Sequence, residues 1–204
     1  MIQSFQCEEA AQLFAGKRVK RFANIASVAV RKLQQLDSAA TLDAMRAPPG
    51  NRLEALAGDR RGQHSIRVND QWRVCFVWKA DGVHDVEIVD YHLTARDHVV
   101  KKSIPAPKNA MRPVHPGEVL REDYLLPLGM SANALSIALK VPASRINDIV
   151  LERRGVTVDT AMRIVRYFGG DVQSWMNLQT AYEIKVAEKL LSKKVLADVQ
   201  PMAA

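Results

Sequence analysis

Four polar side chains near residue 145 have the types and spacing that read DNA bases. They occupy the outward positions of a predicted helix that follows a short turn: Ser144, Arg145, Asn147 and Asp148. Arginine can bridge two acceptors of guanine, asparagine can bridge adenine, and aspartate can accept from cytosine. A helix-turn-helix motif presents such groups to the major groove from the start of its second helix. The pattern therefore predicts a DNA-reading helix over residues 143–151.

Residues just beyond this helix are candidates for holding the DNA backbone. Arg153 and Arg154 supply positive charge, and Thr157 can cap the next helix, whose first backbone N–H groups attract phosphate. An ordinary pair of antiparallel helices with solvated polar residues gives the same local pattern, so that alternative stays open.

A second polar group, Asp90-Tyr91-His92, closes a strand-like run in the first half of the chain. Taken alone, such a strand end is more typical of a surface edge than of a catalytic centre. His64 and His84 lie in other strand-like runs, and we interpret them as structural or solvated. Cys7 and Cys75 are far apart and belong to no metal-ligand spacing, so neither a metal nor a cofactor is expected.

Five helical segments are expected to position the DNA-reading residues. Their ranges are 116–125, 131–139, 143–151, 158–168 and 174–191. Proline and glycine separate the segments, and Ser131 and Thr157 are candidate caps. Trp175, Leu178 and Tyr182 form a stripe on the last segment, which is more typical of a core or a dimer contact than of a ligand site.

A helical segment over residues 27–37 is expected to pack one side against the first core. Val28, Leu33 and Leu36 recur near the helical period. The polar residues of this segment fall at other positions and are expected to lie outside the core: Arg31, Lys32 and Gln35.

From residue 62 onward the pattern alternates as in strands. Val74, Phe76 and Trp78 fall on one side of a run, and Asp81-Gly82 is a strong hairpin signal. The first half is therefore predicted to be an α+β domain, with helices on one face of a twisted antiparallel sheet.

The change of pattern divides the 204 residues into two domains and a linker. The first domain is expected over residues 1–92, the linker over 93–110 and an all-α helix-turn-helix domain over 111–204. The linker contains two prolines and several lysines, which leave little to pack. Because Met111 opens the second domain, the chain looks like two genes joined naturally or by engineering.

Composition limits the partners and the compartment. The net charge is +7 and is spread along the chain, which favours polyanions only weakly. No apolar run approaches the roughly 18 residues of a membrane span, and no signal peptide is recognisable. We therefore expect a cytoplasmic protein that does not insert into membranes.

The second domain resembles the HigA (VapI-type) antitoxins, which are Xre/Cro-like repressors. The resemblance covers nearly all of residues 111–190 and is carried by the following motifs: Arg112-Pro113-Val114-His115-Pro116-Gly117-Glu118, Pro127-Leu128-Gly129-Met130-Ser131, Tyr167-Phe168-Gly169 and Trp175-Met176-Asn177-Leu178. It implies a homodimer that binds an inverted-repeat operator in DNA.

The first domain resembles the HigB toxins of the RelE superfamily. The residues that carry the resemblance are Asn51-Arg52-Leu53-Glu54, Gly58-Asp59-Arg60, Ser65-Ile66-Arg67-Val68-Asn69, Gln71-Trp72-Arg73 and Asp90-Tyr91-His92. The resemblance implies a metal-independent mRNA endonuclease that acts on the ribosome, with ribosome and mRNA as partners.

The resemblance also implies roles for the polar residues. Attack of an RNA 2′-hydroxyl on its own phosphate needs proton transfer and a cation for the developing charge. His92 is suited to transfer a proton, and Arg67 or Arg73 is suited to stabilise the developing negative charge. Tyr91 can stack a base or assist proton transfer, and Asp90 can orient a cationic neighbour.

One departure from the HigB pattern weakens this expectation. Where some HigB proteins carry His and Lys after Leu53, this chain has Glu54 and Ala57. Loss of a base and a cation predicts weak nuclease activity, or a larger burden on the remaining arginines: Arg60, Arg67 and Arg73.

Together these patterns predict a type II toxin-antitoxin fusion. The nuclease is expected to be latent, neutralised by a linked antitoxin that also binds operator DNA and represses transcription. The toxin-antitoxin contact can form within one chain or between neighbours, because a linker of this length spans either distance. The alternative is a DNA-binding regulator whose toxin-like domain is inactive.

Overall fold

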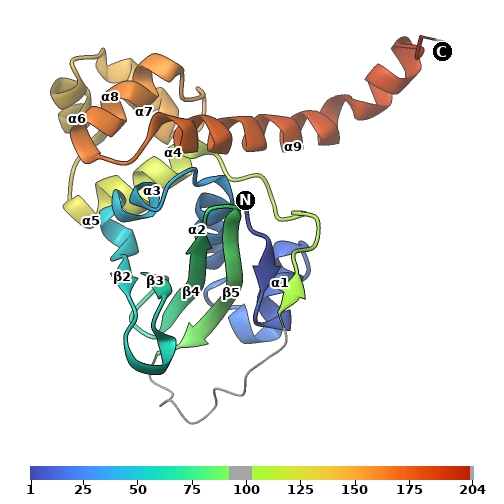
Figure 1. Cartoon of the computed structure of the whole chain (residues 1–204). Helices are drawn as coiled ribbons and strands as arrows, with labels where there is room; N and C mark the ends of the chain where they lie inside the picture. Colours follow the sequence, from blue (N-terminus) through green and yellow to red (C-terminus); the bar gives the residue numbers. More distant parts are fainter. Residues whose placement is uncertain (92–102, 203–204) are drawn as a thin grey trace.

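The computed structural model describes residues 1–91 and 103–202 (Figure 1). We call residues 1–91 and 103–110 the N-terminal part and residues 111–202 the C-terminal part. The elements of the N-terminal part are β1 (Ser4–Phe5), α1 (Glu8–Phe14), the 3-10 helix η1 (Lys20–Phe22), α2 (Ala26–Ser38), α3 (Asp43–Arg46), the 3-10 helix η2 (Pro49–Asn51), β2 (Glu54–Ala55), the 3-10 helix η3 (Gly58–Arg60), β3 (Gln63–Arg67), β4 (Trp72–Lys79), β5 (Gly82–Asp90) and β6 (Ile104–Pro105). This α+β organisation confirms the predicted fold class.

The strands form one six-stranded sheet in the order β2-β3-β4-β5-β1-β6. Neighbours from β2 to β5 are antiparallel, as the alternation predicts. β1 runs parallel to β5, with Phe5 opposite Val86, so the expectation of an antiparallel sheet is wrong for this pair of strands. The chain between β1 and β5 is long enough to return in the parallel direction.

The last part of the predicted linker belongs to this sheet. Ile104 pairs with Phe5, and the Ala110 N–H donates to the Phe14 carbonyl at 3.0 Å. The expectation that the linker packs little is therefore wrong here. An uncovered β1 would leave a row of unpaired backbone groups, which β6 satisfies. The rest of the predicted linker lies within 92–102, outside the described residues.

Helix α2 contacts both the sheet and the C-terminal part. Leu33 and Leu36 are fully buried, as their spacing predicts. Arg31, Lys32 and Gln35 are buried too, which corrects the expectation that they lie outside the core. The C-terminal part covers their side of the helix, and the pattern of one helix cannot report a surface supplied by residues far along the chain.

All described elements of the C-terminal part are helices, as predicted. They are α4 (Pro116–Val119), the π-helical turn η5 (Leu120–Leu125), α5 (Leu126–Leu128), α6 (Ala132–Leu139), α7 (Ala143–Val150), α8 (Val158–Phe168) and α9 (Val172–Asp198). Helices α6 to α8 agree with the expected ranges to within one residue at each end. Ser131 caps α6 by accepting from the Ala134 N–H at 3.1 Å.

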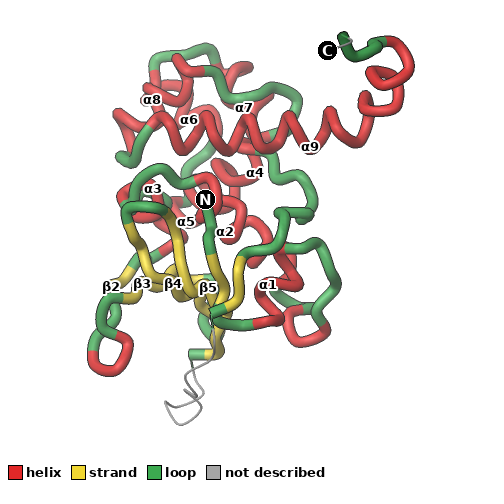
Figure 2. Tube along the Cα trace, turned by 45° about the vertical axis from the view of Figure 1, so that its right-hand side comes forward, coloured by secondary structure: helices red, strands yellow, loops and turns green. Residues whose placement is uncertain are grey.

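Helix α9 crosses the molecule and then projects away from it (Figures 1 and 2). Trp175 and Leu178 are buried near its start, which confirms the predicted core stripe. The Tyr182 ring meets the His115 ring edge-on, with centroids 4.7 Å apart. Among the described helices, α9 included, none has the length and apolar composition needed to span a membrane.

Candidate nucleic-acid sites

The candidate catalytic residues do not all share one face of the sheet. Arg67 on β3 lies directly opposite Arg73 on β4, so these side chains are on the same face. The Tyr91 ring packs on Arg73, with its centroid 5.3 Å from the guanidinium carbon. Asp90 occupies the alternate position of its strand and points to the other face, where it accepts from Gln71 Nε2 at 2.5 Å. The structure thus brings together Arg67, Arg73 and Tyr91, without Asp90.

Glu54 adds a carboxylate to this face. One of its oxygens lies 3.1 Å from Arg73 Nη2, and its side chain is 52% exposed. Glu54 stands where a base is expected from the HigB pattern, yet a carboxylate beside a cation can itself accept a proton. His92, the expected proton-transfer residue, lies outside the described residues.

The guanidinium of Arg73 is held in one orientation. Its Nε donates to Ser65 Oγ at 2.8 Å, and its Nη2 donates to the Arg52 carbonyl at 2.9 Å. Arg73 is only 8% exposed. A fixed cation of this kind suits stabilisation of a charge that develops during a reaction. The same bonds leave it fewer N–H groups for a substrate.

The other two arginines differ in how freely they can reach a ligand. Arg67 pairs with Asp70, whose side chain is 92% exposed, and such surface pairs contribute little and exchange easily. Arg60 pairs with Glu87, and both of these side chains are largely buried. Arg67 is therefore better placed than Arg60 to meet a phosphate.

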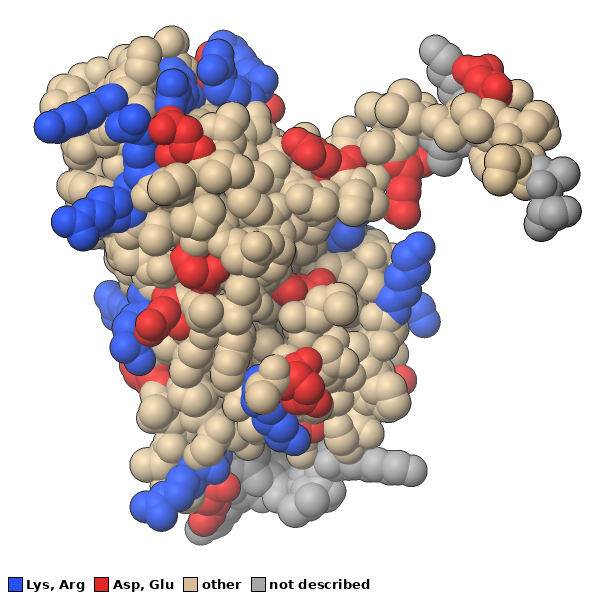
Figure 3. Space-filling model, turned by 45° about the horizontal axis from the view of Figure 1, so that its top comes forward, with Lys and Arg blue, Asp and Glu red and all other residues tan. Residues whose placement is uncertain are grey.

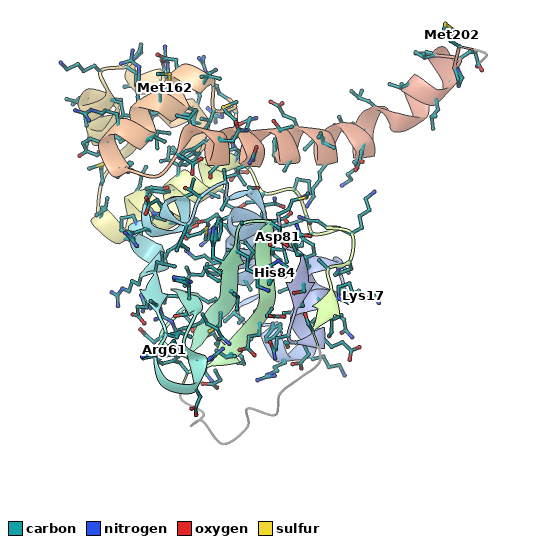
Figure 4. All side chains as sticks on the ribbon, viewed as in Figure 1. Lys17, Arg61, Asp81, His84, Met162 and Met202 are labelled. Atoms are coloured by element: carbon teal, nitrogen blue, oxygen red, sulfur yellow. The ribbon has the colours of Figure 1, made fainter. Side chains whose placement is uncertain are left out.

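The histidines at positions 64 and 84 have structural contacts. The His64 ring stacks on Phe76 with centroids 5.9 Å apart, and burial lowers the pKa of His64. His84 Nε2 lies 3.0 Å from Asp81 Oδ1, and Figure 4 places the two residues together. Within the described part of the chain, no three His, Cys, Asp or Glu side chains gather to hold a metal ion.

Helix α7 presents the predicted base-reading residues at the surface. Ser144 and Asn147 are exposed, whereas Ile146 is fully buried on the opposite side of the helix. Arg145 is partly exposed, and its Nη1 donates to Asp159 Oδ2 on α8 at 2.6 Å. The predicted base-reading side chains therefore lie on the solvent-facing side of α7, and their contact with DNA stays a prediction.

The predicted phosphate-holding residues surround the end of α7. Arg153, Arg154 and Thr157 are all exposed. Arg154 lies 3.8 Å from Asp148, a loose pair that a phosphate can replace. Thr157 Oγ1 accepts from the Thr160 N–H at 3.4 Å and caps α8. Figure 3 shows Lys and Arg side chains gathered at this helical end, and Figure 1 places α6 to α8 on the side away from the sheet.

A buried ion cluster that the sequence pattern does not predict joins the two parts. Asp123 of η5 accepts from Arg31 Nε at 2.8 Å, from Lys32 Nζ at 2.6 Å and from Gln35 Nε2 at 2.6 Å. We call Arg31, Lys32, Gln35 and Asp123 the Asp123 cluster. All four residues are buried. The N-terminal and C-terminal parts therefore contact each other within one chain.

The charges of this cluster make the contact selective. Burial lowers the pKa of Lys32, and the neighbouring Asp123 opposes that shift. A buried ion pair gives little net stability, but removing one partner leaves an uncompensated charge at a cost of about 3–5 kcal/mol. The Asp123 cluster therefore adds little net stability, but an arrangement of the two parts that left one of these buried charges without a partner would be costly.

A sequence signal for this contact exists, although it is weak. Arg31, Lys32 and Gln35 lie within about one turn of a helix, on one side, and no acidic residue is nearby in that helix until Asp37. Cations without a local partner indicate a partner elsewhere. Nothing in the sequence identifies that partner as Asp123.

Comparisons with known proteins follow the same division. Residues 4–92 match the HigB-like toxin family, described as the RelE-like toxin of the type II toxin-antitoxin system HigB. The chain is 45% identical over 69 residues to toxin HigB-1 of Vibrio cholerae, covering 34% of this chain and 72% of the relative. It is 66% identical over 87 residues to virulence-associated protein I of Dichelobacter nodosus, covering 43% and 81%. It is 30% identical over 78 residues to antitoxin HigA-1 of Vibrio cholerae, covering 38% and 72%.

Proposed function

The chain belongs to the HigB toxin family through residues 4–92 and to the HigA antitoxin family through its C-terminal half, and we propose that it is a toxin and its antitoxin joined in one polypeptide. The N-terminal part is a latent ribosome-dependent mRNA endonuclease. The C-terminal part neutralises it and also binds operator DNA as a repressor. The proposed boundaries remain 1–92, 93–110 and 111–204, with Ile104–Pro105 serving as a strand of the toxin sheet.

The proposed nuclease chemistry uses the face around Arg73. The Arg73 and Arg67 guanidinium groups stabilise the negative charge that develops on the phosphate oxygens when an RNA 2′-hydroxyl attacks. His92 or Glu54 takes the proton from that hydroxyl, and Tyr91 stacks a base. The bond from phosphorus to the 5′-oxygen of the next nucleotide then breaks, and His92 or water gives a proton to that leaving oxygen. The support is the shared face of Arg67, Arg73 and Tyr91, with Glu54 at 3.1 Å from Arg73.

The observation that carries the proposed latency is the Asp123 cluster. It joins α2 of the toxin to η5 of the antitoxin through buried charged contacts. A covalent tether keeps the two surfaces at an effective concentration on the order of millimolar, provided the linker spans the contact. The closed arrangement is therefore favoured even if the contact alone is weak.

The proposed DNA-binding function rests on α7 and its surroundings. Arg145 and Asn147 read bases, assisted by Ser144 and Asp148, while Arg153, Arg154 and Thr157 hold phosphates. The antitoxin acts as a homodimer on an inverted-repeat operator, since each copy supplies one reading helix. In this assembly the two roles of the C-terminal part use opposite sides of it (Figure 1).

One observation favours a second candidate, a transcriptional regulator whose toxin-like part is inactive. Arg73 is engaged by Ser65, Arg52 and Glu54, which leaves it few free donors for an RNA phosphate. In that case the N-terminal part only supports the repressor or acts as a co-repressor.

Growth of cells expressing residues 1–92 alone separates the two candidates. A latent toxin should arrest growth, and the same fragment carrying Arg73→Ala should not. The full chain, expressed at the same level, should be harmless. If the fragment is folded by circular dichroism yet harmless, the nuclease proposal is wrong and the regulator becomes the better account.

A further inference from the structure

Within the described residues, the cations of the Asp123 cluster have acidic partners from the C-terminal part and none from their own part of the chain. Arg31 pairs with Asp123 and with Glu118, and Lys32 pairs with Asp123. Both carboxylates belong to the C-terminal part. Among the ion pairs of the described residues, none joins Arg31 or Lys32 to a carboxylate of the N-terminal part. If the parts separate, this side of α2 carries two uncompensated positive charges.

The donors on α2 converge on a single anion. Arg31 contributes Nε and Nη2, at 2.8 and 3.4 Å from the Asp123 oxygens, and Lys32 and Gln35 each contribute one donor at 2.6 Å. An arginine fork and a lysine ammonium are each common phosphate ligands in proteins. The same donors would suit a phosphate in place of the carboxylate.

The N-terminal part itself holds this site in shape. Lys32 Nζ donates to Asn51 Oδ1 at 2.6 Å, and Asn51 Nδ2 donates to the Met45 carbonyl at 2.9 Å. Asn51 is directly followed by Arg52, whose carbonyl accepts from Arg73. The anion site and the candidate catalytic face therefore share one stretch of backbone, so a polyanion that reaches Arg73 passes close to it.

The Asp123 carboxylate does not satisfy the whole site. Gln35 is 93% buried, being 7% exposed, and its Oε1 has no hydrogen-bond partner. A cavity of about 30 Å³ lies against it, lined also by Met45, Tyr124 and Trp175. An unpaired buried acceptor is costly. Asp123 therefore leaves one acceptor of this site unused. Once the C-terminal part has left, a ligand that brings a hydroxyl donor beside its anion, as RNA does with its ribose 2′-hydroxyl, can bond this acceptor.

We propose that Arg31, Lys32 and Gln35 form a binding site for a backbone phosphate of RNA, and that Asp123 occupies this site as a carboxylate in place of the phosphate. The C-terminal part then restrains the toxin by filling an RNA contact on α2, separate from the catalytic face. The identification of the polyanion as RNA rests on the proposed function.

The test compares two charge reversals in the full chain, Asp123→Lys and Glu122→Lys. Both change the net charge equally, but Glu122 pairs with Arg121 at 3.0 Å and its side chain is 32% exposed. Asp123→Lys places a third cation beside Arg31 and Lys32 and should open the contact, which hydrogen exchange of α2 reports. Binding of a short labelled single-stranded RNA is then measured by fluorescence anisotropy over a range of salt, without ribosomes.

We expect Asp123→Lys to bind RNA at least about tenfold more tightly than Glu122→Lys, with a steeper salt dependence. Adding Lys32→Ala to Asp123→Lys should remove the gain. Inorganic phosphate alone should compete only at far higher concentration, which distinguishes an RNA site from a site for the free ion. If Asp123→Lys fails to fold, Asp123→Ser with Glu122→Ser as its control replaces the pair.

Equal RNA affinity of the two variants overturns the proposal. So does a result in which the α2 amides of Asp123→Lys stay protected from hydrogen exchange. Competition by inorganic phosphate at the same concentration as RNA also overturns it. Because binding is measured and no cleavage is required, a failure of the nuclease function leaves this readout unchanged. The two failures are therefore distinguishable.

Discussion

The DNA-reading surface and the Asp123 cluster differ in where the acidic partner of the arginine lies and in how far the ion pair is buried. Arg145 pairs with Asp159 of the same part, and these side chains are 31% and 54% exposed. Arg31 pairs with Asp123 of the other part, and these side chains are 8% and 3% exposed. An exposed pair can exchange its partner for a nucleic acid at little cost, whereas a buried pair cannot separate without leaving a bare charge. The first surface is thus available to a ligand, whereas the second is buried between the two parts.

Removing the carboxylate of the cluster should have the largest effect on stability. Asp123→Ala in the full chain should lower the free energy of unfolding by about 3–5 kcal/mol. Lys32 then stays buried without its carboxylate partner, and Arg31 keeps its 3.5 Å pair with Glu118. Asp148→Ala removes a carboxylate that is 34% exposed and should cost less than about 0.5 kcal/mol. Urea denaturation of the two variants measures both values. Equal losses would mean that the buried pairs do not distinguish this contact from a surface pair.

The candidate catalytic face gives the next largest effect. In the fragment of residues 1–92, Arg73→Ala and His92→Ala should each lower mRNA cleavage on ribosomes by a factor on the order of 10², since one removes charge stabilisation and the other proton transfer. Arg61→Ala, at an exposed arginine of the same part, serves as the control (Figure 4). Full activity in both variants, with folding checked by circular dichroism, would move the chemistry to another face.

On the DNA-reading surface we expect two different losses. Arg145→Ala should relax sequence preference and weaken operator binding by roughly 1–3 kcal/mol. Arg154→Ala should weaken all sequences alike and reduce the salt dependence. Operator titrations at several salt concentrations separate these outcomes, and unchanged binding in both variants would exclude α7 from the interface.

The smallest effect concerns pH. Burial lowers the pKa of His115 below its usual 6.5, and its Nδ1 accepts from the Gly117 N–H at 2.9 Å, which needs the neutral ring. In this case the unfolded chain binds the proton more readily, so this contribution to stability is complete above about pH 6.5 and is lost as pH falls below it. The melting temperature should therefore fall less between pH 8 and pH 5 in His115→Gln than in His84→Gln, as thermal melts at several pH values would measure. Parallel curves for the two variants would contradict this origin of the pH dependence.

The helices and strands were largely predictable because their signals are local. The spacing of Leu33 and Leu36, the caps at Ser131 and Thr157, and the hairpin signal at Asp81-Gly82 each report structure within a few residues. The parallel pairing of β1 and the strand at Ile104 were missed, because both depend on which segments meet across the sheet.

The candidate sites divide in the same way. Ser144 and Asn147 were predicted outward from one helix pattern, and they are exposed. Asp90 and Tyr91 are adjacent in sequence, yet only Tyr91 packs on Arg73, because successive strand residues point to opposite faces. The role of Asp123 was not predictable, since its partners lie on a helix of the other part.

Cleavage of mRNA in a reconstituted translation system tests the central claim most directly. The fragment of residues 1–92 and the full chain are compared at equal concentration, and the ends of the RNA products are analysed. We predict that the fragment cleaves ribosome-bound mRNA to a 2′,3′-cyclic phosphate or its 3′-phosphate, and that the full chain is slower by a factor on the order of 10². A folded fragment that leaves the mRNA intact, or a full chain that cleaves as fast as the fragment, would contradict a toxin held inactive by its own antitoxin.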